Sequence, residues 1–164
     1  MVPDLWAVAV VIVAGIDPGK SGALVILTSD AAGYVRRVPM VKLPKETPAW
    51  SEWATTWGAA LAFGIDAVVI EQVAARPDQG TVSMFNFGRT LGFAHALAAA
   101  AGAPIHFVTP AVWKGKFGLL KADKSASREK ARTLLPLLKE DFRRVKDDGV
   151  AEAALLALYG RKYL

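Results

Sequence analysis

Four acidic residues lie at the ends of apolar segments or within one, where a carboxylate is costly unless it has a partner, although capping of a helix N-terminus would also explain Asp148. Asp17 follows an apolar run, Glu71 ends another, and Asp148 and Glu152 lie four residues apart around an apolar C-terminal segment. A carboxylate in such a place must be paired or must bind a cation. Carboxylate oxygens are the ligands that Mg²⁺ and Mn²⁺ prefer. Two such ions, about 3.5–4 Å apart, can activate water and stabilise the leaving oxygen in phosphodiester hydrolysis. The pattern therefore predicts hydrolytic metal chemistry.

The elements that must position these acids are predicted from apolar periodicity and turn residues. Strands are expected over 6–14, 23–27, 34–43, 66–70 and 104–109, and helices over 48–63, 81–101, 127–138 and 147–159, with a short helix entered at Pro110. At 164 residues the chain is expected to form one domain over 1–164. The order predicts a mixed α/β fold with a five-stranded sheet, three strands antiparallel and two parallel, and helices on both faces.

The turn after the first strand also fits a loose phosphate-binding loop, with Gly19, Lys20 and Ser21 at its end. A true loop of that kind opens a helix, whose N-terminal amides hold the phosphates. Here an apolar run from Ala23 follows, and Pro18 removes one backbone N–H. A strand hairpin is therefore favoured, and a small nucleotide-binding protein stays the weaker alternative.

Charge is distributed unevenly along the chain. The net charge is +5, and the segment from Trp113 to Lys146 contains eleven Lys or Arg but only four Asp or Glu. A basic segment beside an acidic centre suits a protein that holds and cuts a polyanion, although a solvated helical face would also explain it. No cysteine is present, so no disulfide framework is expected. No apolar run has the roughly 18–20 residues of a membrane span, so we expect no membrane association.

Two stripes of residues recur at helical spacing. Trp50, Trp53 and Trp57 would lie on one face of the first helix, where core packing is favoured over base stacking. Gly88, Gly92 and Ala96 leave a smooth stripe on the helix over 81–101, which packing against the sheet or a helix-to-helix dimer contact would explain. Both histidines, His95 and His106, lack a partner at metal-binding spacing and are expected to be structural.

Taken together, these features resemble the RuvC-type Holliday junction resolvases of the RNase H-like (retroviral integrase) superfamily, above all the compact phage-type members. The matching segments are 15–22 (GIDPGKSG), 70–73 (IEQV), 83–89 (SMFNFGR), 110–114 (PAVWK), Lys124 with Arg128, and 148–153 (DGVAEA). They span nearly the whole chain in the expected order.

The resemblance implies an RNase H-like fold and a homodimer that nicks two opposed strands of a four-way DNA junction with two Mg²⁺ or Mn²⁺ ions. Asp17, Glu71, Asp148 and Glu152 match the metal-binding catalytic acids, with Asp147 as an alternate. The residues expected to contact DNA are Lys20, Arg76, Ser83, Phe85, Asn86, Arg89, Trp113, Lys114, Lys116, Lys121, Lys124 and Arg128. Phe85 or Phe87 would open the junction, because Ala74 stands where bacterial members carry an aromatic wedge.

The remaining expectations are a cytoplasmic location, in the host if the gene is a phage's, and no small-molecule cofactor. Within the same fold, a nuclease for branched, flap or RNA–DNA hybrid substrates is the nearest alternative. A non-catalytic DNA-binding module is the alternative if the acids bind no metal.

Overall fold

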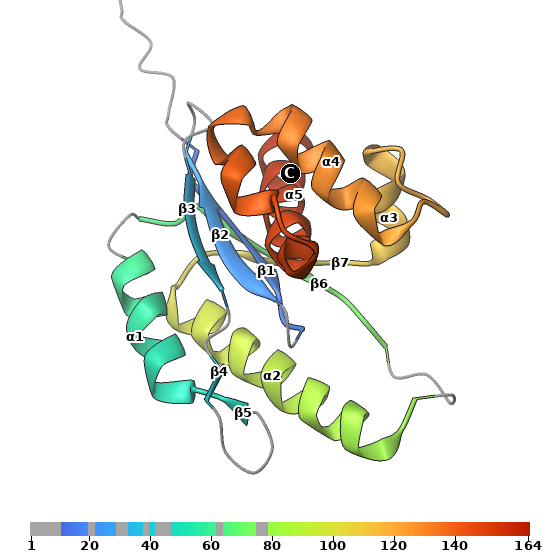
Figure 1. Ribbon diagram of the computed structural model, residues 1–164. Helices are drawn as coiled ribbons and strands as arrows, with labels where there is room; N and C mark the ends of the chain where they lie inside the picture. Colours follow the sequence, from blue (N-terminus) through green and yellow to red (C-terminus); the bar gives the residue numbers. More distant parts are fainter. Residues whose placement is uncertain are drawn as a thin grey trace, which may run out of the picture.

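The computed structural model describes residues 11–19, 22–28, 33–37, 40–41, 47–61, 64–74 and 79–164. Most of the strand predicted over 6–14, and the site residues Lys20 and Arg76, lie outside these ranges. The described chain has a mixed α/β fold with helices on both faces of its main sheet (Figure 1). Among the described residues, no helix is both long and apolar enough to cross a membrane.

The main sheet has the strand order β3-β2-β1-β6-β7. Its strands are β1 (Val13–Asp17), β2 (Ala23–Leu27), β3 (Gly33–Arg37), β6 (Ala67–Glu71) and β7 (Ile105–Val108). The first three form an antiparallel meander, while β6 runs parallel to β1 and β7 runs parallel to β6. The tight turn at Gly19, whose carbonyl accepts the N–H of Gly22 at 2.9 Å, leads into β2. The hairpin prediction is confirmed, because a strand and not a helix follows the turn.

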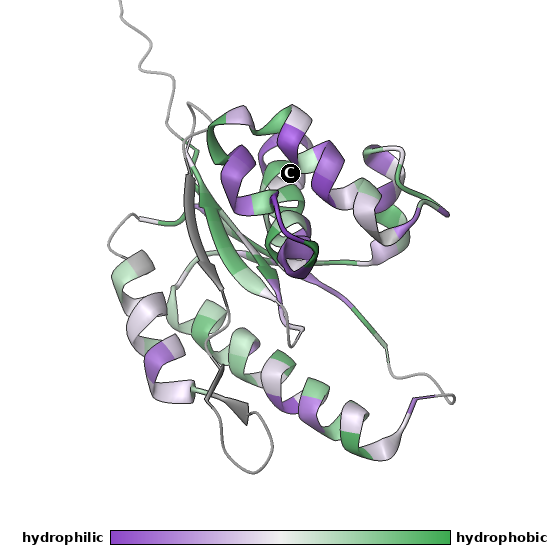
Figure 2. Cartoon of the chain, in the orientation of Figure 1, coloured by the Kyte–Doolittle hydropathy of each residue, from purple (hydrophilic) through white to green (hydrophobic). Residues whose placement is uncertain are grey.

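The two faces of the sheet carry separate hydrophobic cores, because successive strand residues point to opposite sides. On one face lie α1 (Trp50–Leu61) and α2 (Thr81–Ala100), and their core includes Trp53 and Trp57, each 1% exposed. Trp50 is partly buried and packs against the same core, so the tryptophan stripe contributes to core packing, as favoured. On the other face α5 (Asp148–Tyr163) crosses the sheet, accompanied by α3 (Pro110–Lys116) and α4 (Lys124–Leu134). Figure 2 shows α5 as mostly hydrophobic and α4 as mostly hydrophilic.

A close approach of backbones fixes α5 against β1. A Cβ atom built on Gly15 would lie 2.1 Å from the carbonyl oxygen of Ala153 and 2.5 Å from the amide nitrogen of Ala157. Only glycine, which has no Cβ, permits this contact. Gly160 is similarly confined, with the side chains of Val69 and Val13 at 2.7 and 2.8 Å from the same hypothetical atom. The helix therefore packs directly on the two central strands.

The prediction of a single strand over 34–43 is wrong. β3 ends at Arg37, and β4 (Met40–Val41) pairs instead with β5 (Thr47–Pro48) in a separate two-stranded sheet. Alternating apolar residues favour an extended chain but do not specify which neighbour it pairs with.

Two helices near the C-terminus have boundaries other than those predicted. α4 begins at Lys124 and not at 127, because the carboxylate of Asp123 accepts the backbone N–H groups of Ser125 and Ala126 as an N-cap. It ends at Leu134, and the 3₁₀ segments η1 (Pro136–Phe142) and η2 (Val145–Asp147) follow. α5 runs on to Tyr163, one turn beyond the predicted end.

Candidate active site

Asp17 and Glu71 are the last residues of neighbouring parallel strands. In the β1 and β6 register, Ile16 pairs with Ile70, so each acid lies one residue beyond that pair. Asp17 lies two residues after Gly15, and Glu71 lies two residues after Val69. Residues two apart on a strand point to the same face of the sheet, so both acids point to the face that α5 covers. The two carboxylates therefore meet on the α5 face at the carboxyl end of the parallel strands.

The first two turns of α5 bring further acids to this edge. Asp148 and Glu152 are one helical turn apart and so share a face of the helix. Together with Asp17 and Lys114 they line a cavity of about 390 Å³. Three of the four predicted acids thus border one cavity, and Glu71 is coupled to it electrostatically through Glu152.

The electrostatics of this edge are those of crowded carboxylates. Burial, assisted by repulsion from the nearby charges of Glu71 and Glu152, raises the pKa of Asp17 to about 7, although the N–H of Gly19, which donates to Asp17 Oδ1 at 2.9 Å, lowers it. Burial likewise raises the pKa of Glu71, assisted by repulsion from Glu152. Positive charge at this edge would relieve the repulsion.

Two consecutive residues of α3 each contact one acid. The buried indole N–H of Trp113 donates to Glu71 Oε1 at 3.0 Å, and Lys114 Nζ lies 2.8 Å from Glu152 Oε1. The hydrogen bond from Trp113 lowers the pKa of Glu71 against the effect of burial. Sequence reasoning predicted Trp113 to contact DNA; in the structure its side chain is 0% exposed and is directed to Glu71.

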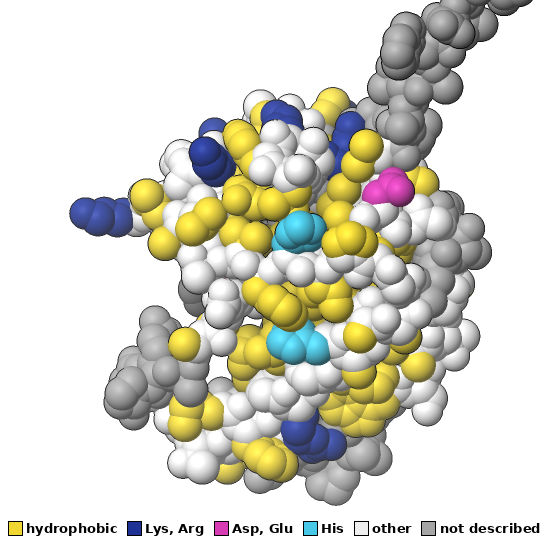
Figure 3. Space-filling view, turned by 180° about the vertical axis from the view of Figure 1, so that it is seen from behind, with side chains coloured by type: hydrophobic (Ala, Val, Ile, Leu, Met, Phe, Trp, Pro, Cys, Tyr) yellow, Lys and Arg dark blue, Asp and Glu magenta, His cyan; other side chains and the backbone are white. Residues whose placement is uncertain are grey.

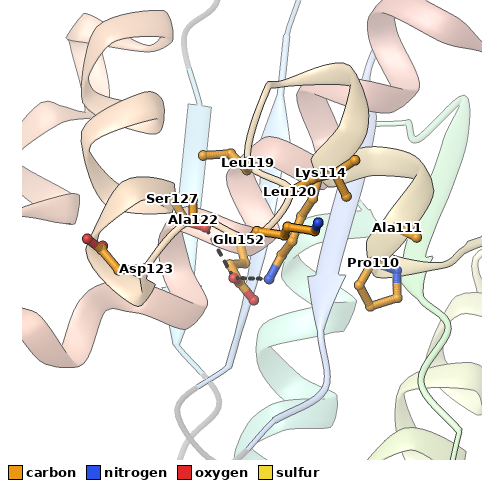
Figure 4. A pocket seen from close by; sticks show the side chains of 10 residues that line it. Pro110, Ala111, Lys114, Leu119, Leu120, Ala122, Asp123, Ser127 and Glu152 are labelled. Atoms are coloured by element: carbon orange, nitrogen blue, oxygen red, sulfur yellow. Dashed lines mark hydrogen bonds and ion pairs between the residues drawn. The ribbon is translucent and has the colours of Figure 1, made fainter.

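The first turns of α4 supply a second pair of contacts. Ser127 Oγ donates to Glu152 Oε1 at 3.2 Å, and Arg128 Nε lies 2.6 Å from Asp148 Oδ1. Figure 4 shows the side chains of Ser127 and Lys114 reaching Glu152 from two sides. Both helices therefore hold acids that α5 presents.

Asp147, the alternate to Asp148, lies in a different environment. Its carboxylate is fully buried, accepts the backbone N–H of Arg144 at 2.7 Å and pairs with that guanidinium at 3.0 Å. This contact closes the η2 turn that precedes α5. Asp147 does not line the cavity, whereas Asp148 does.

The arrangement was compared with known proteins. No protein-family model and no curated protein matches the sequence. Among solved structures, Thermus thermophilus RuvC in complex with a Holliday junction substrate aligns with a TM-score of 0.59 and 22% identity, covering 93% of this chain and 96% of that one. A second Thermus thermophilus RuvC structure aligns with a TM-score of 0.55 and 22% identity, covering 92% and 95%. The chain has the RuvC fold. The predicted resemblance is thereby confirmed at the level of the fold.

Within this RuvC fold, the acids suit a divalent cation by their chemistry. They offer only oxygen ligands, and burial together with repulsion between neighbouring acids raises the pKa of Asp17 and of Glu71, an effect that a bound cation would oppose. In the described part of the chain, no three acidic or histidine side chains are close enough to form a ready-made site. Glu152 and Asp148 are turned to Lys114 and Arg128.

The remaining predicted DNA contacts fall on two parts of the RuvC fold. Ser83, Phe85, Asn86 and Arg89 are exposed on the N-terminal half of α2, with the Arg89 guanidinium over the rings of Phe85 and Trp50 at 5.7 and 5.5 Å. Lys116 and Lys121 are exposed around α3, and Lys116 points over Tyr163 at 5.1 Å. Arg128 faces Asp148. Lys124 starts α4, but its side chain lies outside the described part.

Sequence reasoning missed Ser127 as a contact of the site. Its hydroxyl is buried beneath Glu152, and an isolated serine in a polar segment carries no pattern that predicts this. Asp123 could have indicated where α4 begins, because Asp is a typical N-cap residue and its carboxylate accepts the backbone N–H of Ser125. A helix that begins after Asp123 has Ser127 and Arg128 in its first turns.

Proposed function

We propose that this protein is a divalent-metal-dependent endonuclease that resolves four-way DNA junctions as a homodimer. The observation that carries the proposal is the placement of Asp17, Glu71 and Glu152, from β1, β6 and α5, at one edge of a RuvC fold, where their charges interact. A neighbour with this fold is a RuvC in complex with a Holliday junction substrate.

Asp17, Glu71, Asp148 and Glu152 would hold the cation, as Mg²⁺ or Mn²⁺ in two sites. When bound, the ions would supply an activated water and stabilisation of the leaving oxygen. The chain's own contribution is to fix these acids. Gly19 orients Asp17 and Trp113 orients Glu71, each by one N–H donor. Contacts of this kind orient metal ligands and tune their basicity.

The surface around the cavity suits a phosphate backbone. The segment Trp113 to Lys146 carries an excess of seven positive charges, and the cavity itself includes Lys114 and Lys146. Basic side chains bind the backbone of DNA without reading its sequence. This surface therefore positions the DNA, and the junction's shape supplies the selectivity.

A second copy of the chain would complete the symmetric enzyme through α2 and the neighbouring edge of the sheet. Gly88 and Gly92 lie on the exposed side of α2, and a Cβ on either would meet open space. From behind, Figure 3 shows hydrophobic side chains around both histidines. Phe107 is 46% exposed, and its ring contacts that of His95. An apolar helix face next to a sheet edge is a surface that a dimer would bury.

The decisive experiment is cleavage of a labelled four-way junction beside linear duplex, flap and RNA–DNA hybrid of the same sequence, with Mg²⁺ or with EDTA. We expect paired symmetric nicks in the junction alone, absent with EDTA and in Asp17→Asn. Equal cutting of flaps or hybrids would replace the resolvase with a broader nuclease of the same fold. Absence of any cutting with Mg²⁺ or Mn²⁺ would refute the enzymatic proposal.

Light scattering tests the dimer separately. We expect the wild-type mass to be twice that of the chain and Gly92→Arg to give the monomer with an unchanged circular dichroism spectrum. A wild-type monomer at working concentration would contradict the proposed homodimer.

A further inference from the structure

The ammonium group of Lys114 lies among the acids as a cation. Its Nζ is 2.8 Å from Glu152 Oε1, and the side chain is 29% exposed. It lines both the cavity beside Asp17 and a second cavity of about 290 Å³ between α3 and α4 (Figure 4). The lysine thus lies between two cavities.

Lys114 is electrostatically coupled to more than its direct partner. Its charge lowers the pKa of Asp17 and of Glu71, although burial keeps the pKa of both above the ordinary value. It therefore serves three carboxylates at once: Glu152 by direct contact, and the two strand-end acids through space. A divalent ion held by these acids would take over the same role.

We propose that Lys114 is a resident counter-ion that a divalent metal ion must displace from Glu152. This inference rests on the proposed metal-dependent nuclease. Glu152 Oε1 already accepts hydrogen bonds from Lys114 Nζ and Ser127 Oγ, so both lone pairs of this oxygen are occupied before an ion arrives. A second cation beside the ammonium would also be repelled by it.

The geometry gives the displaced lysine somewhere to go. A lysine side chain is a point charge on a flexible four-carbon stem, and the second cavity opens on the far side of the ion pair. Once released from Glu152, the ammonium remains at the rim of the active site, where a DNA phosphate is its natural partner. Metal loading and phosphate binding are thereby coupled through one side chain.

The first test compares Lys114→Met with Lys116→Met, which removes the same charge from the same helix but at a position directed to Tyr163. Mg²⁺ affinity is measured without DNA, from the dependence of the melting temperature on Mg²⁺ concentration. We expect Lys114→Met to bind Mg²⁺ about five-fold more tightly than wild type, equivalent to about 1 kcal/mol. Lys116→Met should match the wild type.

Unchanged or weaker Mg²⁺ binding by Lys114→Met overturns the inference, while the nuclease proposal stands if the wild type responds to Mg²⁺ and cleaves junctions. No response of the wild type to Mg²⁺ or Mn²⁺ overturns both.

The second test uses the unaltered protein and does not depend on a variant that folds. Limited acetylation of lysines is followed by mass spectrometry with EDTA or with saturating Mg²⁺. Release from Glu152 should raise the labelling rate of Lys114 about two- to five-fold, the range expected for losing an ion pair of about this strength. The rate at Lys116 should stay constant. Slower or constant labelling of Lys114 overturns the inference.

Discussion

The indole N–H of Trp113 donates to Glu71 Oε1 at 3.0 Å, from a side chain that is 0% exposed. This bond joins α3 to the end of β6 and fixes one oxygen of an acid whose pKa is raised by burial. A buried carboxylate without a donor is costly, so Trp113 keeps Glu71 in place.

Trp113→Phe should keep the aromatic packing and remove the donor. We expect Mg²⁺ affinity and cleavage rate each to fall about 10-fold, as found for residues that orient metal ligands. Trp53→Phe, altered on the opposite face of the sheet, should leave both unchanged. Isothermal titration with Mg²⁺ and single-turnover cleavage measure the two quantities. Equal effects of the two substitutions would contradict an orienting role.

Asp17→Asn should abolish cleavage and stabilise the metal-free protein. Because the pKa of Asp17 rises from 3.8 to about 7 on folding, the folded state binds more protons than the unfolded state between these values. Stability contributed by this group therefore falls as pH rises from 4 to 7, by up to about 4 kcal/mol. Urea unfolding with EDTA at pH 5 and pH 8 covers about two of these pH units, so it should show a loss of about 3 kcal/mol in the wild type and a smaller one in Asp17→Asn. A pH dependence equal in both would refute the assignment.

Asp147 and Asp148 should separate stability from activity. Asp147→Asn removes the charge of a buried carboxylate that pairs with the half-exposed guanidinium of Arg144, which should lower the free energy of unfolding by about 1–3 kcal/mol while cleavage persists below the melting transition. Asp148→Asn should abolish cleavage and leave the free energy of unfolding nearly unchanged, because its side chain lines the cavity. Denaturant melts and junction cleavage on the same preparations decide the matter. Loss of cleavage in a folded Asp147→Asn protein would make Asp147 the metal ligand.

Gly15→Ala tests the packing of α5 on β1. The added Cβ would clash with backbone atoms of Ala153 and Ala157, which cannot move independently of the helix. We expect a loss of about 3 kcal/mol or more and loss of Mg²⁺ binding. Gly58→Ala, on the exposed side of α1 with open space around it, should instead stabilise by about 0.5–1 kcal/mol. A Gly15→Ala protein as stable as wild type would contradict the close contact.

The positions of the acids at the strand ends could be predicted from the sequence, but the side chains that donate hydrogen bonds to the acids could not. Asp17 and Glu71 follow apolar runs of the length of a strand, so their place at the sheet edge could be derived from the sequence. Trp113 could not be oriented, because a helix as short as α3 has no periodicity that distinguishes a buried face from an exposed one. The contact of Ser127 with Glu152 depends on how α4 packs against α5, which local patterns do not encode.

Because of the contact at Gly15, the candidate active site forms only when the chain has folded completely. Asp17 and Glu152 are more than 130 residues apart in the chain and become neighbours only when α5 lies on β1. A nascent chain whose synthesis has not reached α5 can form the hairpin of β1 and β2, yet it lacks half of the acids. If the proposed nuclease activity is correct, cutting would begin only after α5 has docked, and partly folded chains would leave DNA intact.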